Sequence, residues 1–465
     1  MATPHVLILA AGKGTRMKSG RPKVLHPVAG TPMIDYVLEA AAGLGAASRT
    51  VVVGHEAAQL QAALAAHADL RFVLQEPQLG TAHAVQQAAP LFAGVKGTLV
   101  LLSGDVPLLS VETLRALLAR HEESGAAATI LTAVVSNPFG YGRIIRDGDS
   151  VAAIVEQRDA TEAERAVPEI NSGIYAFDLE PLFPALAQIA SNNAQKEFYL
   201  TDLVGIYRRA GRKVSALVAD RPEEILGINS RAELAAMSQR VWQARRAALM
   251  AAGVTLEDPE TTYVDRGVTI GPDTVIRPGV SLLGRTSIGA RVVIHSGVRI
   301  VDSQVADDVT VLDHCVVVGS QVAEGASVGP FAHVRPGSEL CAGSRIGNFV
   351  EVKKTKLGRG SKASHLAYLG DATIGEKVNI GAGTITCNYD GVKKNQTVIE
   401  DGVFIGSDSQ LVAPVTVGKG AYVAAGSTIT DEVPPGALGI ARSKQVNKEG
   451  WVRLKKALRG TENGK

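Results

Sequence analysis

An aliphatic residue recurs every six positions through the C-terminal half of the chain, and this period restricts the fold more than any other feature. The series runs from Val264 to Val352 with one short slip near residue 305, and it resumes from Ile399 to Ile429. A helix cannot keep an apolar face at period six and a strand alternates at two, whereas a three-sided coil turns one aliphatic inward on each side. We therefore predict a left-handed parallel β-helix, whose corners suit the glycines that often follow the repeated aliphatic. The alternative is a prism that only assembles subunits.

Composition limits the class of protein. At 465 residues the chain is too long for one compact domain, and 46% apolar content with only 4% aromatic residues suits a solenoid beside an Ala-rich α/β domain. A net charge of +2 favours neither a nucleic acid nor a membrane surface as a partner. Three widely spaced cysteines outside any metal-ligand pattern indicate thiols in a reducing cytoplasm. The N-terminus reads as a strand rather than a signal peptide, and no apolar run approaches the length of a membrane span.

The N-terminal half alternates short apolar runs with Ala-rich helical segments. Strands are expected at His5–Ala11, Thr50–Val53, Arg71–Leu74 and Thr98–Leu102, and a helix at Val111–Ser124. This order predicts a Rossmann-like α/β domain with a mostly parallel sheet. Ligand sites of such sheets lie beyond the carboxyl ends of the strands, where both Gly-rich breaks of this half occur.

The loop after the first strand, Gly12-Lys13-Gly14-Thr15-Arg16-Met17, matches neither the Walker loop nor the dinucleotide fingerprint. What remains is a glycine turn whose amides can approach a phosphate closely, with cations on both sides. Lys13, Arg16 and Lys23 supply that charge, and Pro22 fixes the approach of Lys23. Taken alone, such a Gly-x-Gly is equally well a plain turn.

From Leu9-Ala10-Ala11-Gly12 through Thr15-Arg16-Met17 to Pro22-Lys23, the chain resembles the sugar-1-phosphate nucleotidyltransferases, and the resemblance covers residues 4–229. It implies that Lys23 and Arg16 are catalytic. It also implies that UTP and the UDP-sugar product contact the following residues: Leu9, Ala10, Ala11, Gly12, Lys23, Gln75, Gly80, Thr81, Ser103, Gly104, Asp105, Gly142, Glu156, Asn171 and Asn229. Ser103 stands where the family more often has tyrosine.

These residue types fit nucleotidyl transfer. A sugar 1-phosphate must attack the α-phosphate of a nucleoside triphosphate and expel pyrophosphate, so the barrier falls mainly by positioning and charge neutralisation. The resemblance implies Asp105 and Asn229 as ligands of Mg²⁺, a cation that prefers oxygen donors. Glu156 and Asn171 can hydrogen-bond the sugar and its acetamido group. The alternatives are that Asp105 caps the next helix, that Glu156 is a solvated strand-end charge, and that both asparagines are turn residues.

Residues 230–253 are expected to form a helical connector between the halves. Ser230 can cap its start, Glu233 stands where a capping box requires it, and Gly253 ends it. We therefore divide the chain into a nucleotidyltransferase domain (1–229), the connector (230–253), the β-helix (254–441) and a basic tail (442–465).

Unusual polar residues interrupt the prism between residues 333 and 390, and a polar loop that includes residues 393–395 breaks the period. Arg335 and Lys353 lie eighteen residues apart, which is one full three-sided turn, so they would stack and could clamp one phosphate. His365 is suited to take the proton from an amine that attacks a thioester. Taken alone, a histidine in a solenoid is more often a surface or packed residue.

The whole chain resembles a bacterial bifunctional family that joins a uridyltransferase to a glucosamine-1-phosphate acetyltransferase. The resemblance implies acetyl-CoA-dependent N-acetylation of glucosamine 1-phosphate, followed by uridylyl transfer from UTP that yields UDP-N-acetylglucosamine and pyrophosphate. It implies His365 as the general base, and it assigns glucosamine 1-phosphate to Arg335, Lys353, Tyr368 and Asn379. It assigns acetyl-CoA to Ala382, Asn388, Tyr389, Ser407, Ala425 and Arg442. It also implies a homotrimer whose subunits share each acetyl site, and flat sides pack readily around a threefold axis.

The tail after Arg442 is basic, with Trp451 and Leu454 as apolar positions. It is either a solvated helix or a lid whose charge meets the phosphates of coenzyme A across a subunit boundary. For the whole chain, the alternatives are a single-activity sugar-1-phosphate nucleotidyltransferase with a structural or regulatory β-helix, and a non-catalytic scaffold. The polar residues between 335 and 389 favour two activities, because a purely structural prism has no need of them.

Overall fold

The computed structural model describes residues 3–462, with side chains as far as Leu458, so residues 463–465 of the predicted tail lie outside the described residues. Contacts divide the chain into two compact units, Met1–Val241 and Trp242–Lys465. Helix α8 (Arg231–Ala251) crosses this division and lies within the segment predicted to connect the domains. None of the described helices is long and apolar enough to cross a membrane.

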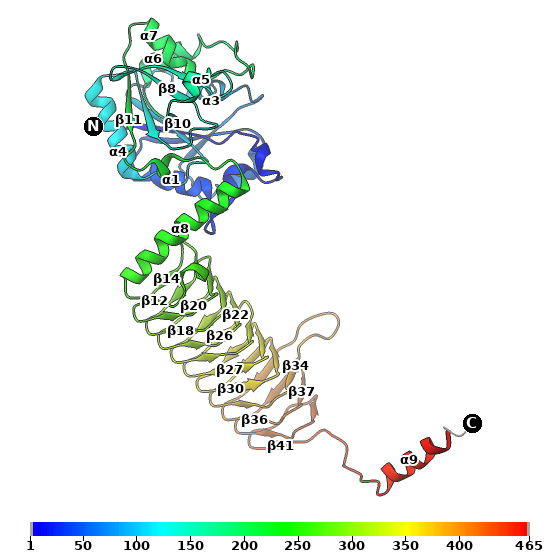
Figure 1. Cartoon of the computed structure of the whole chain (residues 1–465). Helices are drawn as coiled ribbons and strands as arrows, with labels where there is room; N and C mark the ends of the chain where they lie inside the picture. The colour runs from blue at the N-terminus through cyan, green and yellow to red at the C-terminus, as the bar shows by residue number, and fades with distance from the viewer. Residues whose placement is uncertain (1–2, 463–465) are drawn as a thin grey trace. The chain divides into compact units, whose positions relative to one another are not determined.

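The first unit is built on a nine-stranded sheet in the order β11-β7-β10-β6-β1-β4-β5, with β8 and β9 attached as a hairpin beside β10. β10 runs antiparallel to β6 and β7, and the other pairs along the path are parallel. The strands are β1 (His5–Leu9), β4 (Ser48–Val53), β5 (Leu70–Leu74), β6 (Thr98–Ser103), β7 (Ala128–Val134), β8 (Arg143–Asp147), β9 (Ser150–Val155), β10 (Glu169–Asp178) and β11 (Val214–Val218). The predicted mostly parallel sheet is confirmed (Figure 1).

Helices and a small two-stranded sheet connect these strands. The helices are α1 (Met33–Gly43), α2 (Ala57–Ala63), α3 (Thr81–Gln86), α4 (Val111–Ser124), α5 (Glu162–Arg165), α6 (Leu179–Leu186) and α7 (Leu203–Arg209), and the small sheet pairs β2 (Pro27–Val28) with β3 (Thr31–Pro32). Alternation along β1 serves a core on each face of the sheet, because Val6 and Ile8 enter one apolar cluster and Leu7 enters another. Each fully buried aliphatic of this kind contributes about 1.5–3 kcal/mol.

In the second unit, three ladders of short parallel strands form the predicted β-helix (Figure 1). The first sheet runs from β12 (Thr255–Leu256) to β41 (Leu438–Gly439), the second from β13 (Tyr263–Val264) to β40 (Thr428–Ile429), and the third from β14 (Thr269–Ile270) to β38 (Val415–Val417). Successive strands of one sheet lie one coil apart, so that Val334 of β25 (His333–Val334) pairs with Val352 of β28 (Glu351–Lys353).

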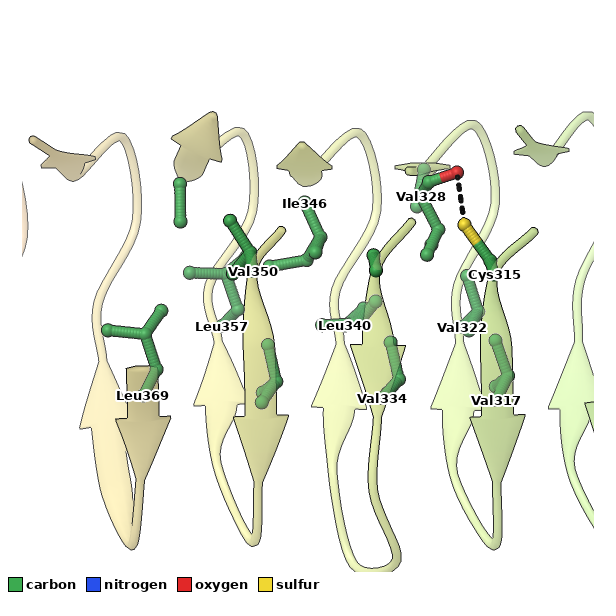
Figure 2. Close-up of a cluster of buried hydrophobic side chains, with 14 of the residues drawn as sticks. Cys315, Val317, Val322, Val328, Val334, Leu340, Ile346, Val350, Leu357 and Leu369 are labelled. Carbon is green, nitrogen blue, oxygen red and sulfur yellow. Dashed lines mark hydrogen bonds between the residues drawn. The ribbon is translucent and has the colours of Figure 1, made fainter. Parts of the chain in front are cut away.

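The repeated aliphatics fill the interior of the prism. Val317, Val334, Leu340 and Ile346 have no exposed surface, and Figure 2 shows their side chains stacked coil upon coil. Cys315 joins this column, and its thiol donates to the Val328 carbonyl at 3.6 Å. The three cysteines are free thiols. The core is continuous along the prism, so each coil depends on its neighbours for burial.

The six-residue period is lost between Val352 and Ile399, but the break in the coils is shorter than the sequence suggests. The coils continue through it with buried inward residues: Leu357, Ala363, Leu369, Ile374 and Ile380. Steps of five instead of six residues at some corners hide this continuity from a strict period. Only the segment between β34 (Ile385–Cys387) and β35 (Thr397–Ile399) leaves the prism as a projecting loop (Figure 1).

Candidate active sites in the two units

Two neighbouring parallel strands bring the glycine loop and Asp105 to one edge of the sheet. Leu9, the last residue of β1, pairs with Ser103, the last residue of β6. The chain then stays close, because the Gly104 N–H donates to the Leu9 carbonyl at 2.9 Å. A Cβ at Gly104 would lie 3.1 Å from that same oxygen, so glycine allows the approach. The glycine loop and Asp105 therefore lie at the carboxyl ends of neighbouring parallel strands, where a ligand site of such a sheet is expected.

A compact group of charged and polar side chains lies at this edge. Lys23 Nζ donates to Asn229 Oδ1 at 2.9 Å and forms an ion pair with Asp105. Arg16 donates to the same Asn229 oxygen at 2.8 Å. The four residues are more than 200 positions apart at their extremes, and the fold brings them together as the resemblance implies. Asp105 does not cap α4, because the Ser110 hydroxyl accepts the first-turn Thr113 N–H at 3.2 Å.

This group fits a magnesium ion. The carboxylate of Asp105 and the amide oxygen of Asn229 already converge on one positive charge, the Lys23 ammonium. Both donors are hard oxygens, the kind that Mg²⁺ prefers, and Mg²⁺ typically completes its shell with phosphate oxygens and water. Among the described residues no cluster of three or more His, Cys, Asp or Glu side chains could hold a metal. Asp105 and Asn229 are thus chemically suited to hold Mg²⁺.

A cavity of about 500 Å³ opens beside this group. Ten of the residues assigned to the nucleotide line it: Leu9, Ala10, Ala11, Gly12, Lys23, Gln75, Gly80, Thr81, Ser103 and Asp105. Gln78 and Glu197 also line it, and no sequence motif indicated them. Gly14 is required for the loop, because its φ is 57° and a Cβ there would lie 2.7 Å from the Lys23 Cβ.

One wall of the cavity is a glycine turn pinned to a distant segment. Gln75 donates to the Gly80 carbonyl at 2.9 Å, and Gly80 has a φ of 110° that favours glycine. The Thr81 hydroxyl accepts the Leu200 N–H at 3.1 Å, while the Phe198 N–H donates to the Leu79 carbonyl at 2.8 Å. These bonds fix the positions of Gln75, Gly80 and Thr81, which line the cavity.

Among the predicted residues that do not line that cavity, Gly142, Glu156 and Asn171 form a group of their own. The Asn171 N–H donates to the Gly142 carbonyl at 2.9 Å, and a Cβ at Gly142 would lie 3.4 Å from a Glu156 carboxylate oxygen. Burial raises the pKa of Glu156, and the Thr201 hydroxyl, which donates to it at 3.5 Å, opposes that rise. Glu156 is therefore half-buried rather than a solvated charge. Thr201 was not indicated by the sequence.

In the β-helix, Arg335 and Lys353 stack as predicted, because each follows one of the paired residues Val334 and Val352. Arg335 Nη1 forms an ion pair with the Glu351 carboxylate at 2.7 Å. The projecting loop adds a cation that the motif assignment omitted. The Lys353 ammonium beside Lys394 lowers the pKa of Lys394, so these two positive charges lie close together. Such a pair is stabilised by an anion such as a phosphate.

His365 ends β30 (Lys362–His365) directly beside Asn348 at the end of β27 (Arg345–Asn348). Its Nδ1 donates to Asn348 Oδ1 at 2.6 Å, and the ring is exposed to solvent. The bond selects the tautomer in which Nε2 is free to accept a proton. Asn379, in β33 (Asn379–Ile380), occupies the next strand of the same sheet, paired with Lys362. Asn348 was not indicated by the sequence.

Four of the residues assigned to acetyl-CoA follow one corner of the prism down from His365. The Gly383 N–H donates to the carbonyl of Leu366, which follows His365, at 2.8 Å. One coil further, the backbone N–H of Asp408 donates to the Ala382 carbonyl at 2.7 Å, and the backbone N–H of Gly426 donates to the Ser407 carbonyl at 2.8 Å. Ala382, Ser407 and Ala425 therefore occupy equivalent corners of successive coils. Arg442 lies next to this corner, because a Cβ added at Gly426 would lie 3.9 Å from Arg442 Cδ. A long ligand could lie along this corner.

Two further assigned residues lie in or next to the projecting loop. Asn388 is buried and donates to the Asp371 carboxylate, while Tyr389 is 60% exposed and its hydroxyl donates to the Gly391 carbonyl at 2.6 Å. Tyr368, in β31 (Tyr368–Gly370), pairs with Glu351 on the neighbouring coil. Asp390 helps to hold the loop, because its carboxylate accepts hydrogen bonds from two backbone N–H groups and from Asn395. These hydrogen bonds lower the pKa of its carboxyl to about 2.

Comparisons with known proteins agree with both halves of this description. A family model described as the MobA-like NTP transferase domain matches residues 6–199, and one described as bacterial transferase hexapeptide (six repeats) matches residues 267–302 and 396–431. The Bifunctional protein GlmU of Trichlorobacter lovleyi is 54% identical over 98% of this chain and 99% of its own. The Bifunctional protein GlmU of Pelobacter propionicus is 53% identical over 98% of this chain and 100% of its own. That of Brevibacillus brevis is 52% identical over 96% of this chain and 97% of its own.

The first two of these relatives match 98% of the chain, so the match extends through both halves and the residues between them. A single-activity transferase with a structural prism, or a non-catalytic scaffold, does not agree with them. The chain therefore belongs to the GlmU family of bifunctional proteins, enzymes that unite a uridyltransferase with a glucosamine-1-phosphate acetyltransferase.

Proposed function

We propose that the β-helix acetylates glucosamine 1-phosphate with acetyl-CoA, and that the N-terminal unit then joins the product to UTP with Mg²⁺. The observation that carries this proposal is the presence of two chemically different groups in one chain. One is the set of cations and oxygen donors around Asn229, and the other is the Asn348–His365 pair above a continuous corner. The first suits phosphoryl chemistry, and the second suits proton removal.

In uridylyl transfer, a phosphate oxygen of N-acetylglucosamine 1-phosphate forms a bond to the α-phosphorus of UTP, and the bond to pyrophosphate breaks. Lys23 and Arg16 neutralise the charge that develops on the phosphates. Asp105 and Asn229 would hold Mg²⁺, which neutralises phosphate charge when it is bound. Glu156 and its neighbours orient the sugar. No side-chain nucleophile is needed, because positioning supplies much of the rate enhancement.

In acetyl transfer, the amine of glucosamine 1-phosphate attacks the thioester carbonyl of acetyl-CoA. His365 Nε2 takes a proton from the nitrogen as the new C–N bond forms, and the C–S bond breaks to release the coenzyme thiol. The hydrogen bond to Asn348 holds the ring in the tautomer that can accept this proton. Arg335, Lys353 and Lys394 offer positive charge to the sugar phosphate, with Tyr368 and Asn379 on its sugar.

The second unit also supports the predicted homotrimer. The third sheet turns polar side chains outward, among them Gln304, Gln321 and Lys356. By contrast, the first sheet exposes Phe404 and Tyr422, whose rings stack at 5.2 Å. Exposed apolar surface of this kind favours burial against another copy of the chain. We further propose that the basic helix α9 (Trp451–Glu462) covers coenzyme A from a neighbouring subunit, and that the enzyme works in the reducing cytoplasm, which suits its free thiols.

Separate substitutions in each unit test the assignment. We expect H365A to lower acetyl transfer about 10²–10⁴-fold, the usual contribution of a general base, with uridylyl transfer unchanged. We expect D105A to do the reverse. Both activities are measured on one preparation, with glucosamine 1-phosphate and acetyl-CoA in one assay and with N-acetylglucosamine 1-phosphate, UTP and Mg²⁺ in the other. Equal loss of both activities in a folded variant would contradict the separation of the sites.

A further inference from the structure

The first turn of α8 contacts both loops that carry the charged groups of the uridylyl-transfer site. Glu233 Oε2 accepts a hydrogen bond from the backbone N–H of Asn229 at 2.5 Å. Arg231 Nε donates to the carbonyl of Met17 at 3.2 Å, and Met17 follows Arg16 directly. The helix therefore fixes the backbone next to the two side chains that meet at Asn229 Oδ1.

The Glu233 bond differs from an ordinary capping box. Ser230 caps the helix, because its hydroxyl accepts the Glu233 N–H at 3.2 Å. In a complete box the glutamate would return to the N–H of Ser230 itself. Here its carboxylate accepts the N–H of Asn229 instead, so its partner is the site residue rather than the cap.

The supporting elements hold this turn in place. Met237 and Val241 of α8 pack with Val28 and Ile228 in an apolar cluster of the first unit. The Ile228 N–H also donates to the Asp105 carbonyl at 3.0 Å. The segment before Asn229 is thus bound to Asp105 on one side, and Asn229 is bound to Glu233 on the other.

We propose that Glu233 is a positioning residue for uridylyl transfer, which orients Asn229 so that its side-chain oxygen faces Lys23, Arg16 and the metal. This inference rests on the proposed role of Asn229 as a magnesium ligand. When Glu233 is replaced by alanine, the Asn229 N–H loses its acceptor and the peptide can rotate, which turns Oδ1 away from the cation. Glutamine retains an acceptor oxygen of similar reach.

The test compares E233A, E233Q, S230A and N229A in the full-length protein. Binding of Mn²⁺ in the presence of a non-hydrolysable UTP analogue is measured by electron paramagnetic resonance, and uridylyl and acetyl transfer are measured on the same samples. We expect E233A to weaken Mn²⁺ binding and to lower uridylyl kcat/KM about tenfold, which corresponds to one hydrogen bond to a charged group. E233Q should recover most of both losses, and acetyl transfer should not change.

S230A is the matched control for helix capping, because it removes the cap hydroxyl and leaves Glu233 in place. It should lower thermal stability without altering Mn²⁺ affinity. Wild-type Mn²⁺ binding in E233A, or equal weakening by S230A, would overturn the positioning role. If N229A itself leaves Mn²⁺ binding unchanged, the assignment of Asn229 as a ligand fails instead, and the two failures are thereby distinguished.

Discussion

Side chains of the uridylyl-transfer site differ in how completely their charges are paired. Lys23 and Asp105 form an ion pair, and Lys23 also bonds Asn229, so this group is ordered by internal contacts. The Glu156 carboxylate accepts a long hydrogen bond from Thr201, and burial raises the pKa of its carboxyl. A carboxylate that is half-buried and weakly paired is costly until a ligand donates to it. If Glu156 binds the sugar as proposed, the sugar hydroxyls supply those donors, and the protonation state of Glu156 then affects sugar binding.

We expect sugar binding by the N-terminal unit to weaken as pH falls toward a point above 4.5, the ordinary pKa of a glutamate. The raised pKa means that Glu156 gains a proton, and loses its ability to accept from the sugar, at a higher pH than usual. T201V removes a hydrogen bond that lowers this pKa, so it should move the acid limb of kcat/KM for N-acetylglucosamine 1-phosphate to higher pH. A limb that stays in place or moves to lower pH in T201V would contradict this account.

Several residues around the sites could not be inferred from the sequence, for a physical reason. Gly12, Lys23 and Asp105 belong to short contiguous motifs at strand ends, so a local pattern identifies them. Thr201 and Asn348 act through hydrogen bonds to residues 45 and 17 positions away, and nothing in their own neighbourhood indicates this. Such contacts depend on strand order and coil register, which become visible only in the folded chain.

At the scale of elements, the β-helix was predictable because one constraint repeats. Each side of every coil must turn an aliphatic residue inward, and this requirement appears in the sequence as a period of six residues. The coils between Val352 and Ile399 were obscured by shorter corners. The corners also set where small residues are required: Gly347 lies in β27, and a Cβ there would overlap the backbone carbonyl of Ser364 on the next coil. That carbonyl directly precedes His365, so the backbone at Gly347 and the position of the proposed general base are linked.

We expect G347A to lower the free energy of unfolding of the β-helix by about 1–3 kcal/mol, the usual cost of overpacking, and to reduce acetyl transfer because the strand that carries His365 must shift. G343A is the matched control. Gly343 has a φ of 64° with open space around its Cβ, so alanine there should cost only about 1–2 kcal/mol of backbone strain and leave activity intact. Denaturant unfolding and the acetyl-transfer assay measure both effects. Equal acetyl-transfer activity in G347A and G343A would show that the backbone at Gly347 does not affect the position of His365.

For the molecule as a whole, the two units bury titratable groups of different kinds. In the first unit, burial lowers the pKa of three of the histidines, His5, His26 and His121, below 6.5. This unit also holds acids such as Asp35, whose pKa burial raises. The second unit is filled almost entirely by aliphatic side chains, with few buried groups that change charge. The two units should therefore respond differently to acidification.

We expect the N-terminal unit to lose stability before the β-helix when pH falls from 7 to about 5.5. A histidine whose pKa is lowered in the folded state binds its proton more readily when unfolded, so stability is lost as pH falls through 6.5 toward the folded value. Each such group contributes at most about 1.4 kcal/mol per pH unit. At lower pH the buried acids oppose this loss of stability, because their raised pKa values let the folded state bind protons more readily. The effect of the histidines is therefore measured between pH 7 and about 5.5. Calorimetry should resolve an earlier transition that follows the loss of uridylyl activity. In H121Q the side chain keeps a hydrogen-bonding group near Thr129 but cannot be protonated, so the pH dependence of this transition should be reduced. Parallel acid shifts of both transitions, with H121Q indistinguishable from wild type, would show that these histidines do not govern the acid response.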